Sequence, residues 1–177
     1  MTTKKSGYIL AIKLLFGLFI QTLLFISCSE NKAKQPSDSI PKYDGVTIDV
    51  DISNVNCLAI LLAKDGTINR KGSGVLDTLD KIFFMGLAKD NPFDSLMNGI
   101  PNDLLTYCNT PSPKCDTLKQ IFKVKIAFGN NDSVCEIEYC VNGLMNDLPK
   151  PIKDFLEKAI LVTDPWYQSQ KKTLITK

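Results

Sequence analysis

The sequence contains no histidine at any of its 177 positions. This absence excludes Ser-His-Asp and Cys-His catalysis, histidine-ligated zinc or copper, and pH sensing by imidazole. No two cysteines are spaced as Cys-x-x-Cys, so the sequence supports neither a thioredoxin-like redox site nor a zinc ribbon. The enzyme chemistries that remain depend on paired carboxylates, lysine or a thiol alone. We expect no metal and no cofactor.

Basic charge is scarce outside the N-terminus. The chain has 21 basic and 19 acidic residues, but three of the lysines and none of the acids lie in residues 1–27, which leaves 18 against 19 and a net charge of −1. The densest basic cluster, Asn69-Arg70-Lys71, has no aromatic residues interleaved with it. We therefore expect no nucleic-acid partner.

The longest hydrophobic run lies at the N-terminus. Lys4 and Lys5 precede it, the chain is largely apolar from Leu14 to Ile26, and a small residue, Ser27, comes directly before Cys28. This order of basic, apolar and small residues is typical of an export signal. The stretch from Leu14 is shorter than the roughly 20 residues that span a bilayer.

The residues Leu23-Leu24-Phe25-Ile26-Ser27-Cys28 resemble the lipobox of bacterial lipoproteins, and the following Ser29-Glu30 is similar to lipoproteins of Bacteroidota-type bacteria. The resemblance implies that residues 1–27 are a signal peptide removed before Cys28, and that Cys28 is acylated and held in the lipid bilayer. Two or three acyl chains make a firm anchor, since each buried methylene adds about 0.8 kcal/mol. We expect an outer-membrane lipoprotein of the bacterial cell envelope, facing the periplasm or the cell surface. In the alternative, Ile9 to Ser27 form an uncleaved helix in the inner membrane.

The rest of the chain divides by composition. Residues 28–44 hold the lipidated cysteine and a polar, flexible tether with almost no apolar side chain to bury. Residues 45–167 form a single α+β domain, and residues 168–177 are expected to be a frayed C-terminal tail.

Two patterns predict the first strands. Apolar and polar residues alternate from Val46 to Ile52, which indicates a strand with one buried face. The continuous apolar run from Cys57 to Ala63 predicts a strand buried on both faces. Asp65-Gly66 then predicts a tight hairpin that returns over residues 67–70.

Helical spacing of apolar residues follows. Leu76 to Leu87 predict one helix, which ends before Pro92, and two shorter helical pieces follow it around Phe93 and Leu104. A last helix is expected from Pro149 to about Thr163, ended by Asp164-Pro165.

A second hairpin is predicted from Phe122 to Val141, because apolar and polar residues alternate on both sides of Gly129-Asn130-Asn131-Asp132. A symmetric turn pairs Lys125 with Glu136 and Lys123 with Glu138 on one face. Strands, helices, a hairpin and a helix in this order predict an α+β fold, an antiparallel sheet of hairpins with helices packed on one face.

Five cysteines follow Cys28, so that at most two disulfides form among them: Cys57, Cys108, Cys115, Cys135 and Cys140. The favoured prediction is a disulfide between Cys108 and Cys115 that closes a proline-rich loop. In the alternatives, this loop is tied to the sheet through Cys135 or Cys140, or the two cysteines are a reactive redox pair. Cys135 and Cys140 lie five apart in one strand and must face opposite sides. Cys140 is then the better candidate for a disulfide to a covering loop or for a free thiol open to a partner.

Trp166 and Tyr167 are expected to pack back on the sheet or to form an interaction surface. The leading functional hypothesis is a membrane-anchored envelope lipoprotein with a non-enzymatic binding or structural role and an envelope protein as partner. An inhibitor or immunity protein against an envelope toxin or hydrolase is the close alternative. A different class is an enzyme that works without histidine, with its chemistry on residues such as Asp65, Asp90, Asp94 or Cys140.

Overall fold

The computed structural model describes residues 43–75, 81–101, 103–130 and 132–176. The predicted signal peptide, Cys28 and most of the predicted tether lie outside these residues. The described elements are β1 (Gly45–Ile52), β2 (Val55–Ala63), β3 (Thr67–Lys71), β4 (Phe83–Leu87), α2 (Pro92–Met97), η1 (Leu104–Tyr107), β5 (Ile121–Gly129), β6 (Val134–Asn142), η2 (Met145–Asp147) and α3 (Lys150–Ile175).

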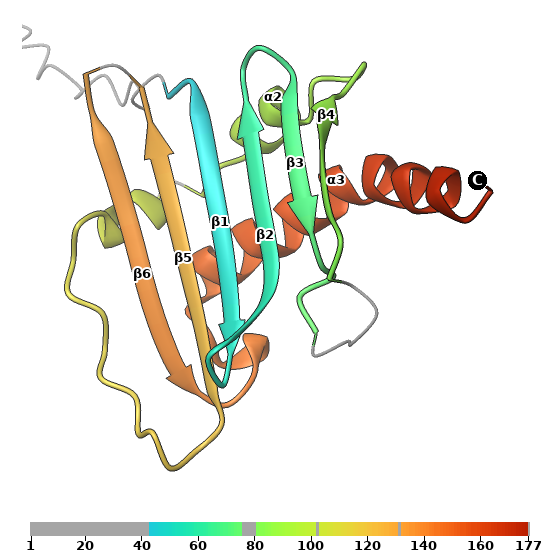
Figure 1. Ribbon diagram of the computed structural model, residues 1–177. Coiled ribbons are helices and arrows are strands. Elements are labelled where there is room, and N and C mark those ends of the chain that lie inside the picture. Colours follow the sequence, from blue (N-terminus) through green and yellow to red (C-terminus); the bar gives the residue numbers. More distant parts are fainter. Residues whose placement is uncertain (1–42, 76–80, 102, 131, 177) are drawn as a thin grey trace, which may run out of the picture. The chain divides into compact units, whose positions relative to one another are not determined.

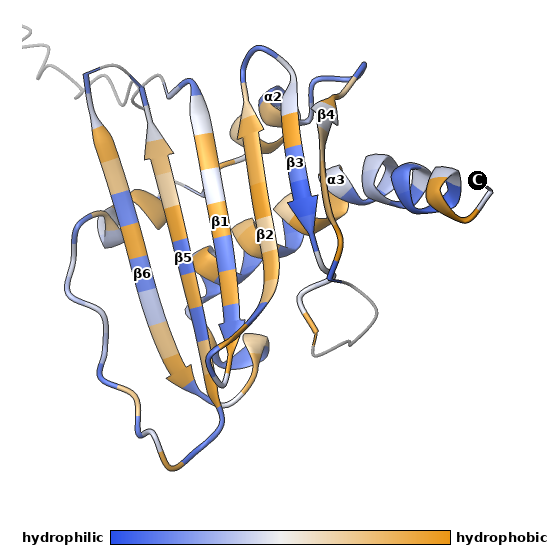
Figure 2. Ribbon diagram, in the orientation of Figure 1, coloured by the Kyte–Doolittle hydropathy of each residue, from blue (hydrophilic) through white to orange (hydrophobic). Residues whose placement is uncertain are grey.

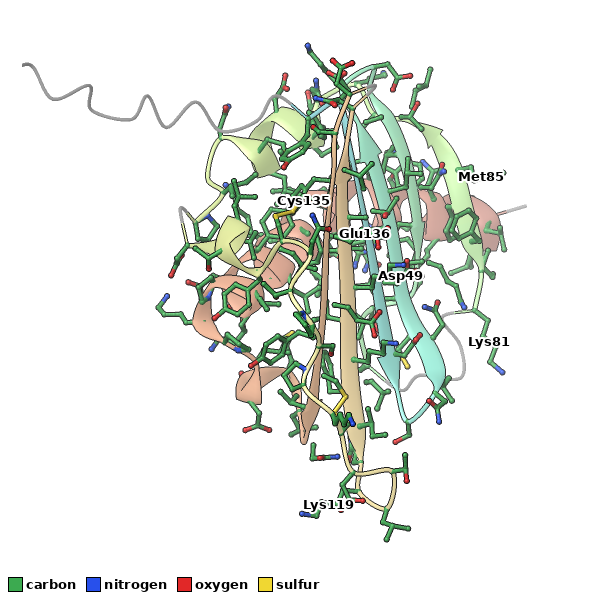
Figure 3. The ribbon with its side chains drawn as sticks, turned by 90° about the vertical axis from the view of Figure 1, so that its left-hand side faces the viewer. Asp49, Lys81, Met85, Lys119, Cys135 and Glu136 are labelled. Carbon is green, nitrogen blue, oxygen red and sulfur yellow. A yellow bond between two sulfur atoms is a disulfide. The ribbon has the colours of Figure 1, made fainter. Side chains whose placement is uncertain are left out.

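The strands form one antiparallel sheet of six strands in the order β4-β3-β2-β1-β5-β6. Helices α2 and α3 lie behind this sheet in Figure 1, and no described helix covers its front. The edge-on view of Figure 3 shows the same two sides. The predicted α+β fold, with its helices on one face, is confirmed. We call the front the open face.

The hydrophobic core lies between the sheet and α3. In β1, Val46, Ile48 and Val50 are buried, because alternate residues of a strand face the same side. Phe155 and Leu156 of α3 pack against them from behind, within an apolar stripe of helical period. The sheet is therefore amphipathic, as Figure 2 shows by the alternation of colours along its strands.

The Asp65-Gly66 hairpin between β2 and β3 is confirmed, and Gly66 has the positive φ of 90° that such a turn requires. The burial of β2 differs from the prediction. Leu58, Ile60 and Leu62 are buried against the helices, whereas Leu61 is only half-buried on the open face. Among the described residues, no second layer of helices lies on the open face to complete the burial of a continuous apolar strand.

The helix predicted over Leu76 to Leu87 is wrong where the structure describes it. Residues 76–80 lie outside the described residues, and Phe83–Leu87 form the edge strand β4. Gly86 lies so close to α3 that an added Cβ would stand 3.2 Å from Cζ2 of Trp166. A glycine in close contact and two adjacent phenylalanines favour a strand, and sheet pairing overrides the helical spacing.

The predicted end of the last helix at Asp164-Pro165, and the frayed tail from residue 168, are also wrong. Helix α3 continues through Pro165 to Ile175. Proline removes only the hydrogen bond to the carbonyl of Leu161, a residue on the exposed side of the helix. The two shorter helical pieces are confirmed as α2 and η1.

Arg70 holds α3 against β3 on both sides of this proline. Its side chain is only 1% exposed, and its guanidinium donates hydrogen bonds to the carbonyl of Ile160 at 3.1 Å and to Oγ1 of Thr163 at 2.8 Å. It also forms an ion pair with Asp164 at 3.3 Å and lies 4.6 Å from the ring centroid of Tyr167. Buried arginine is stable only with such a set of partners, and these partners join the turns of α3 on both sides of Pro165 to β3.

The second hairpin is confirmed as β5 and β6, with a register two residues away from the prediction. Lys125 lies opposite Glu138, and Lys123 lies opposite Cys140. The predicted charge pairs form diagonally instead, with Lys123 2.8 Å from Glu138 and Lys125 4.0 Å from Glu136. A shift of two residues keeps every side chain on its predicted face.

Candidate interaction surface

Two disulfides join the loop after η1 to strand β6. Cys108 is bonded to Cys135 and Cys115 to Cys140, so the predicted bond between Cys108 and Cys115 is wrong. The alternative that ties this loop to the sheet is confirmed. Cys140 is consequently not the free thiol. Among the described cysteines the free one is Cys57, which is buried, with its thiol directed at the carbonyl of Val55.

The loop from Cys108 to Asp116, here called the strap, wraps around the edge of the sheet. Cys135 is buried on the helix side, whereas Cys140 pairs beside Lys123 on the open face, so the strap crosses from one face to the other. The backbone N–H of Asn109 donates to the carbonyl of Glu136 at 2.7 Å. Figure 1 shows the strap running alongside β6. It therefore occupies the outer edge of β6, which would otherwise be free to pair.

Charged residues cover the lower half of the open face. The ion pairs of Lys123 and Lys125 with the glutamates of β6 are each more than 40% exposed, so they contribute solubility more than stability. Beside them on β1, partial burial and the neighbouring carboxylate of Asp51 raise the pKa of Asp49, and Lys125 opposes this rise. Figure 3 shows Asp49 and Glu136 on this side of the sheet.

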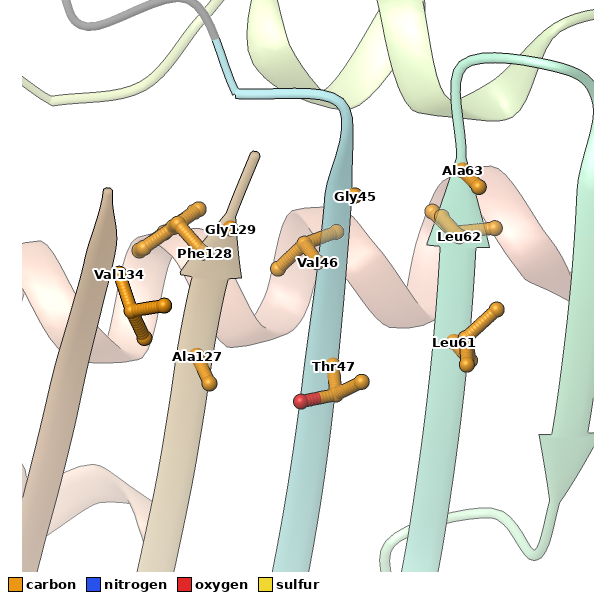
Figure 4. A pocket seen from close by; sticks show the side chains of 10 residues that line it. All are labelled: Gly45, Val46, Thr47, Leu61, Leu62, Ala63, Ala127, Phe128, Gly129 and Val134. Atoms are coloured by element: carbon orange, nitrogen blue, oxygen red, sulfur yellow. The ribbon is translucent and has the colours of Figure 1, made fainter. Parts of the chain in front are cut away.

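A shallow apolar hollow of about 280 Å³ lies on the upper half of the open face. Gly45 and Gly129 are opposite each other on β1 and β5 and leave a gap in the layer of side chains. Leu61 and Val134 stand around it, and Thr47 supplies its hydroxyl (Figure 4). None of the described residues that line the hollow is charged. Its small volume and open mouth suit contact with a protein surface better than enclosure of a ligand.

Strand β4 adds exposed apolar side chains to the same face. Phe83 is 49% exposed, and Met85 and Leu87 are each 72% exposed. All three face the open side, because they pair with Lys71, Asn69 and Thr67 of β3. A row of large apolar side chains at the edge of a sheet is an uncommon feature of an isolated domain, and it makes this edge a candidate interaction surface.

The predicted surface at Trp166 and Tyr167 is only partly present. Tyr167 is 1% exposed, its hydroxyl accepts a hydrogen bond from the backbone N–H of Gly72, and it contributes nothing to the surface. Trp166 is half-buried and lines a groove of about 440 Å³ between α3 and the segment after β4. Leu87 and Asp90 line the same groove.

The residues named for an enzyme are not gathered into one site. Asp65 lies in the β2–β3 turn, where the backbone N–H of Thr67 donates to it and lowers its pKa. Asp94 lies in the first turn of α2 and accepts a hydrogen bond from Asn91, whereas Asp90 lines the groove at Trp166. Neither the hollow nor the groove holds two carboxyl groups. Cys140 carries no thiol, since it is in a disulfide.

Within the described part of the chain, no three acidic or cysteine side chains gather as a metal site. In the same residues, no helix has both the length and the apolar character that crossing a membrane requires. The chain matches no protein-family model. A search of curated proteins also finds no match.

Proposed function

We propose that the protein is a non-enzymatic binding protein of the bacterial cell envelope, anchored to a membrane by acyl chains on Cys28. The lipobox-like residues before Cys28 support the anchor. The two disulfides support an oxidising compartment, since such bonds are rare in proteins of the reducing cytosol. The polar segment after Cys28 supports a tether that leaves the domain free to meet a partner.

The uncovered sheet face is the observation that carries the binding role. Its upper half combines the apolar hollow with the exposed row on β4, and its lower half is charged. An apolar centre beside a polar, solvated rim is the usual composition of a protein interface. The partner is therefore an envelope protein with a matching apolar patch.

The binding role is tested by pull-down from the native envelope extract with the full-length protein. The test variant places charges in the apolar half of the open face, at Val134→Asp and Met85→Asp, which are 60% and 72% exposed and leave the core intact. The matched control is Leu118→Asp, a 94% exposed side chain in the segment between the strap and β5 that does not line the hollow. We expect a partner that the control variant and the unchanged protein retain and the test variant loses. Equal recovery by all three would contradict the proposed surface.

A further inference from the structure

The two edges of the sheet differ in whether their backbone groups are covered. The strap lies along β6, but no described strand lies beyond β4. The N–H of Ala88 donates to the carbonyl of Gly66 at 3.0 Å, so the backbone groups of Ala88 point toward the β3 side. Because these groups alternate in direction along an antiparallel strand, those of Phe83, Met85 and Leu87 point outward.

Strand β4 also lacks the usual defences of an exposed edge. Edge strands are normally protected by proline, by a charged side chain or by a bulge. Phe83–Leu87 contain no proline and no charge, and their pairing with β3 runs without a bulge. The outward backbone groups and the exposed apolar side chains belong to the same residues, so an added strand would contact both.

Helix α3 extends past this edge. It crosses behind β4 at Trp166 and Tyr167, which contact Gly86 and Phe84, and then runs beyond the last strand (Figure 1). The stripe that faces the sheet returns seven residues after Tyr167 at Leu174, which is 53% exposed. Ile175, at the end of the helix, is also apolar and 81% exposed, and the turns between Tyr167 and Leu174 are largely hydrophilic (Figure 2). The turns of α3 beyond Tyr167 therefore lie behind the position that a strand next to β4 would take. None of the described residues occupies that position.

We propose that β4 accepts an extended segment of the partner protein as a seventh strand of the sheet. This inference rests on the proposed binding function and specifies its site. The added strand accepts hydrogen bonds from the outward N–H groups of Phe83, Met85 and Leu87 and donates to their carbonyls. Its alternate side chains lie beside the exposed row on the open face and over the projecting part of α3. Recognition by strand addition of this kind draws affinity from the main chain and specificity from alternate side chains.

The charges around β4 define the flanks of the partner segment. Lys81 and Lys89 bracket the strand, and Lys171 and Lys172 lie on the projecting part of α3. Asp90, which follows Lys89, is an acidic residue near the C-terminal end of β4. A segment with apolar residues at alternate positions and acidic residues at its ends complements this arrangement.

A second copy of the chain fits the edge less well than a lone segment. Antiparallel pairing of two β4 strands about Met85 places Lys81 opposite Lys89 of the second copy. It also brings both α3 helices behind the same point, because each crosses behind Phe84 and Gly86. A strand that carries no helix of its own avoids this collision.

Hydrogen exchange of the full-length protein in a mild detergent tests the proposal. The probe is a synthetic peptide in which valine and threonine alternate between two pairs of glutamates. At a free peptide concentration of about ten times its Kd, we expect exchange at the amides of Phe83, Met85 and Leu87 to slow about elevenfold, as mass action requires. A peptide with N-methylated valines, which cannot pair, should give no protection, and a peptide with lysine flanks should bind more weakly.

Two variants at one position separate pairing from side-chain contact. Met85→Pro removes an outward N–H and leaves the bonds to β3 in place, a position at which edge strands tolerate proline. Met85→Leu keeps the N–H and is the matched control. We expect the leucine variant to bind the peptide and the proline variant to lose protection at Phe83 and Leu87. The N-methylated peptide tests the same point on the unchanged protein if the proline variant does not fold.

Unchanged exchange at β4 with every peptide would overturn the proposal, as would equal protection by the N-methylated peptide. Protection of β4 that rises with protein concentration, without peptide, would assign the edge to a second copy and overturn it as well. The peptide measurement requires neither acylation of Cys28 nor the native partner. A negative result here, together with a partner that a separate Val134→Asp variant loses in the pull-down while Met85 is unchanged, would therefore retain the binding function and reject the strand site.

Discussion

Removal of the disulfide between Cys115 and Cys140 gives a direct measure of what the strap contributes. The perturbation is the double replacement Cys115→Ser and Cys140→Ser, which leaves Cys108 and Cys135 bonded. While the bond between Cys108 and Cys135 is closed, the bond between Cys115 and Cys140 closes a ring. This ring consists of residues 108–115 and residues 135–140. Closing a ring of about 14 residues is worth about 3 kcal/mol in the chain-entropy description. We expect the free energy of unfolding to fall by this amount.

The assay is urea unfolding with and without a thiol reductant. Reductant should destabilise the unchanged protein by more than it destabilises the double variant, because the unchanged protein has two bonds to lose. Leu118→Ser, in the exposed chain between the strap and β5, is the control and should unfold like the unchanged protein. A loss below about 1 kcal/mol would refute the reasoning from ring closure. Peptide mapping that pairs Cys108 with Cys115 would refute the strap itself.

Four further substitutions test other parts of the fold by urea unfolding. An added Cβ at Gly72, where φ is 76°, would stand 2.1 Å from the carbonyl oxygen of Cys57, so Gly72→Ala should cost more than about 2 kcal/mol. Gly129→Ala meets nothing within 4 Å and should change stability by less than about 0.5 kcal/mol, and equal effects of the two would contradict the described backbone. Arg70→Met removes its hydrogen bonds to the carbonyls of Gly72 and Ile160 and its ion pair with Asp164, and should cost about 3 kcal/mol; an unchanged midpoint would show that Arg70 does not hold α3. The raised pKa of Asp49 means that the folded state binds the proton more tightly, a stabilisation present below about pH 4 and lost as the pH rises through the raised value. Asp49→Asn should therefore be more stable than the unchanged protein at pH 7, with an advantage that disappears in acid, and an advantage independent of pH would contradict the assignment.

The hairpins could be predicted from the sequence because their signals are local. Alternation along β1, β5 and β6 fixes which side chains face the core, and Asp65-Gly66 fixes one turn. The register of β5 and β6 was the weaker inference, since charge pairing alone is satisfied directly or diagonally. In the structure the charged pairs are diagonal. Each side chain still lies on its predicted face, because the register is shifted by an even number of residues.

The elements at the other end of the sheet could not be predicted from local patterns. Whether residues 83–87 form a strand depends on β3 beside them and on Trp166 behind Gly86, both distant in sequence. The passage of α3 through Pro165 depends on Arg70, which is 93 residues before Thr163, its partner across the helix. Rules that use only neighbouring residues therefore predict that the helix ends at Pro165.

The candidate surface was missed for a related reason. The sequence predicts a surface at Trp166 and Tyr167, but Tyr167 is buried in contact with Gly72 and Arg70. The exposed apolar residues of β4 lie in a segment whose spacing predicts a helix. In a helix, the same residues would belong to the apolar stripe that faces the core. The favoured bond between Cys108 and Cys115 was wrong, although the opposite orientation of Cys135 and Cys140, which follows from strand geometry alone, is a signal that could have indicated a loop passing around β6.

Metabolic labelling with a clickable fatty acid tests the central claim, the lipid anchor at Cys28, most directly. The unchanged protein and Cys57→Ala, which alters a cysteine outside both disulfides, should carry the label and sediment with membranes. Cys28→Ala should carry none. Label retained by the Cys28→Ala protein, or absent from the unchanged protein, would contradict the account.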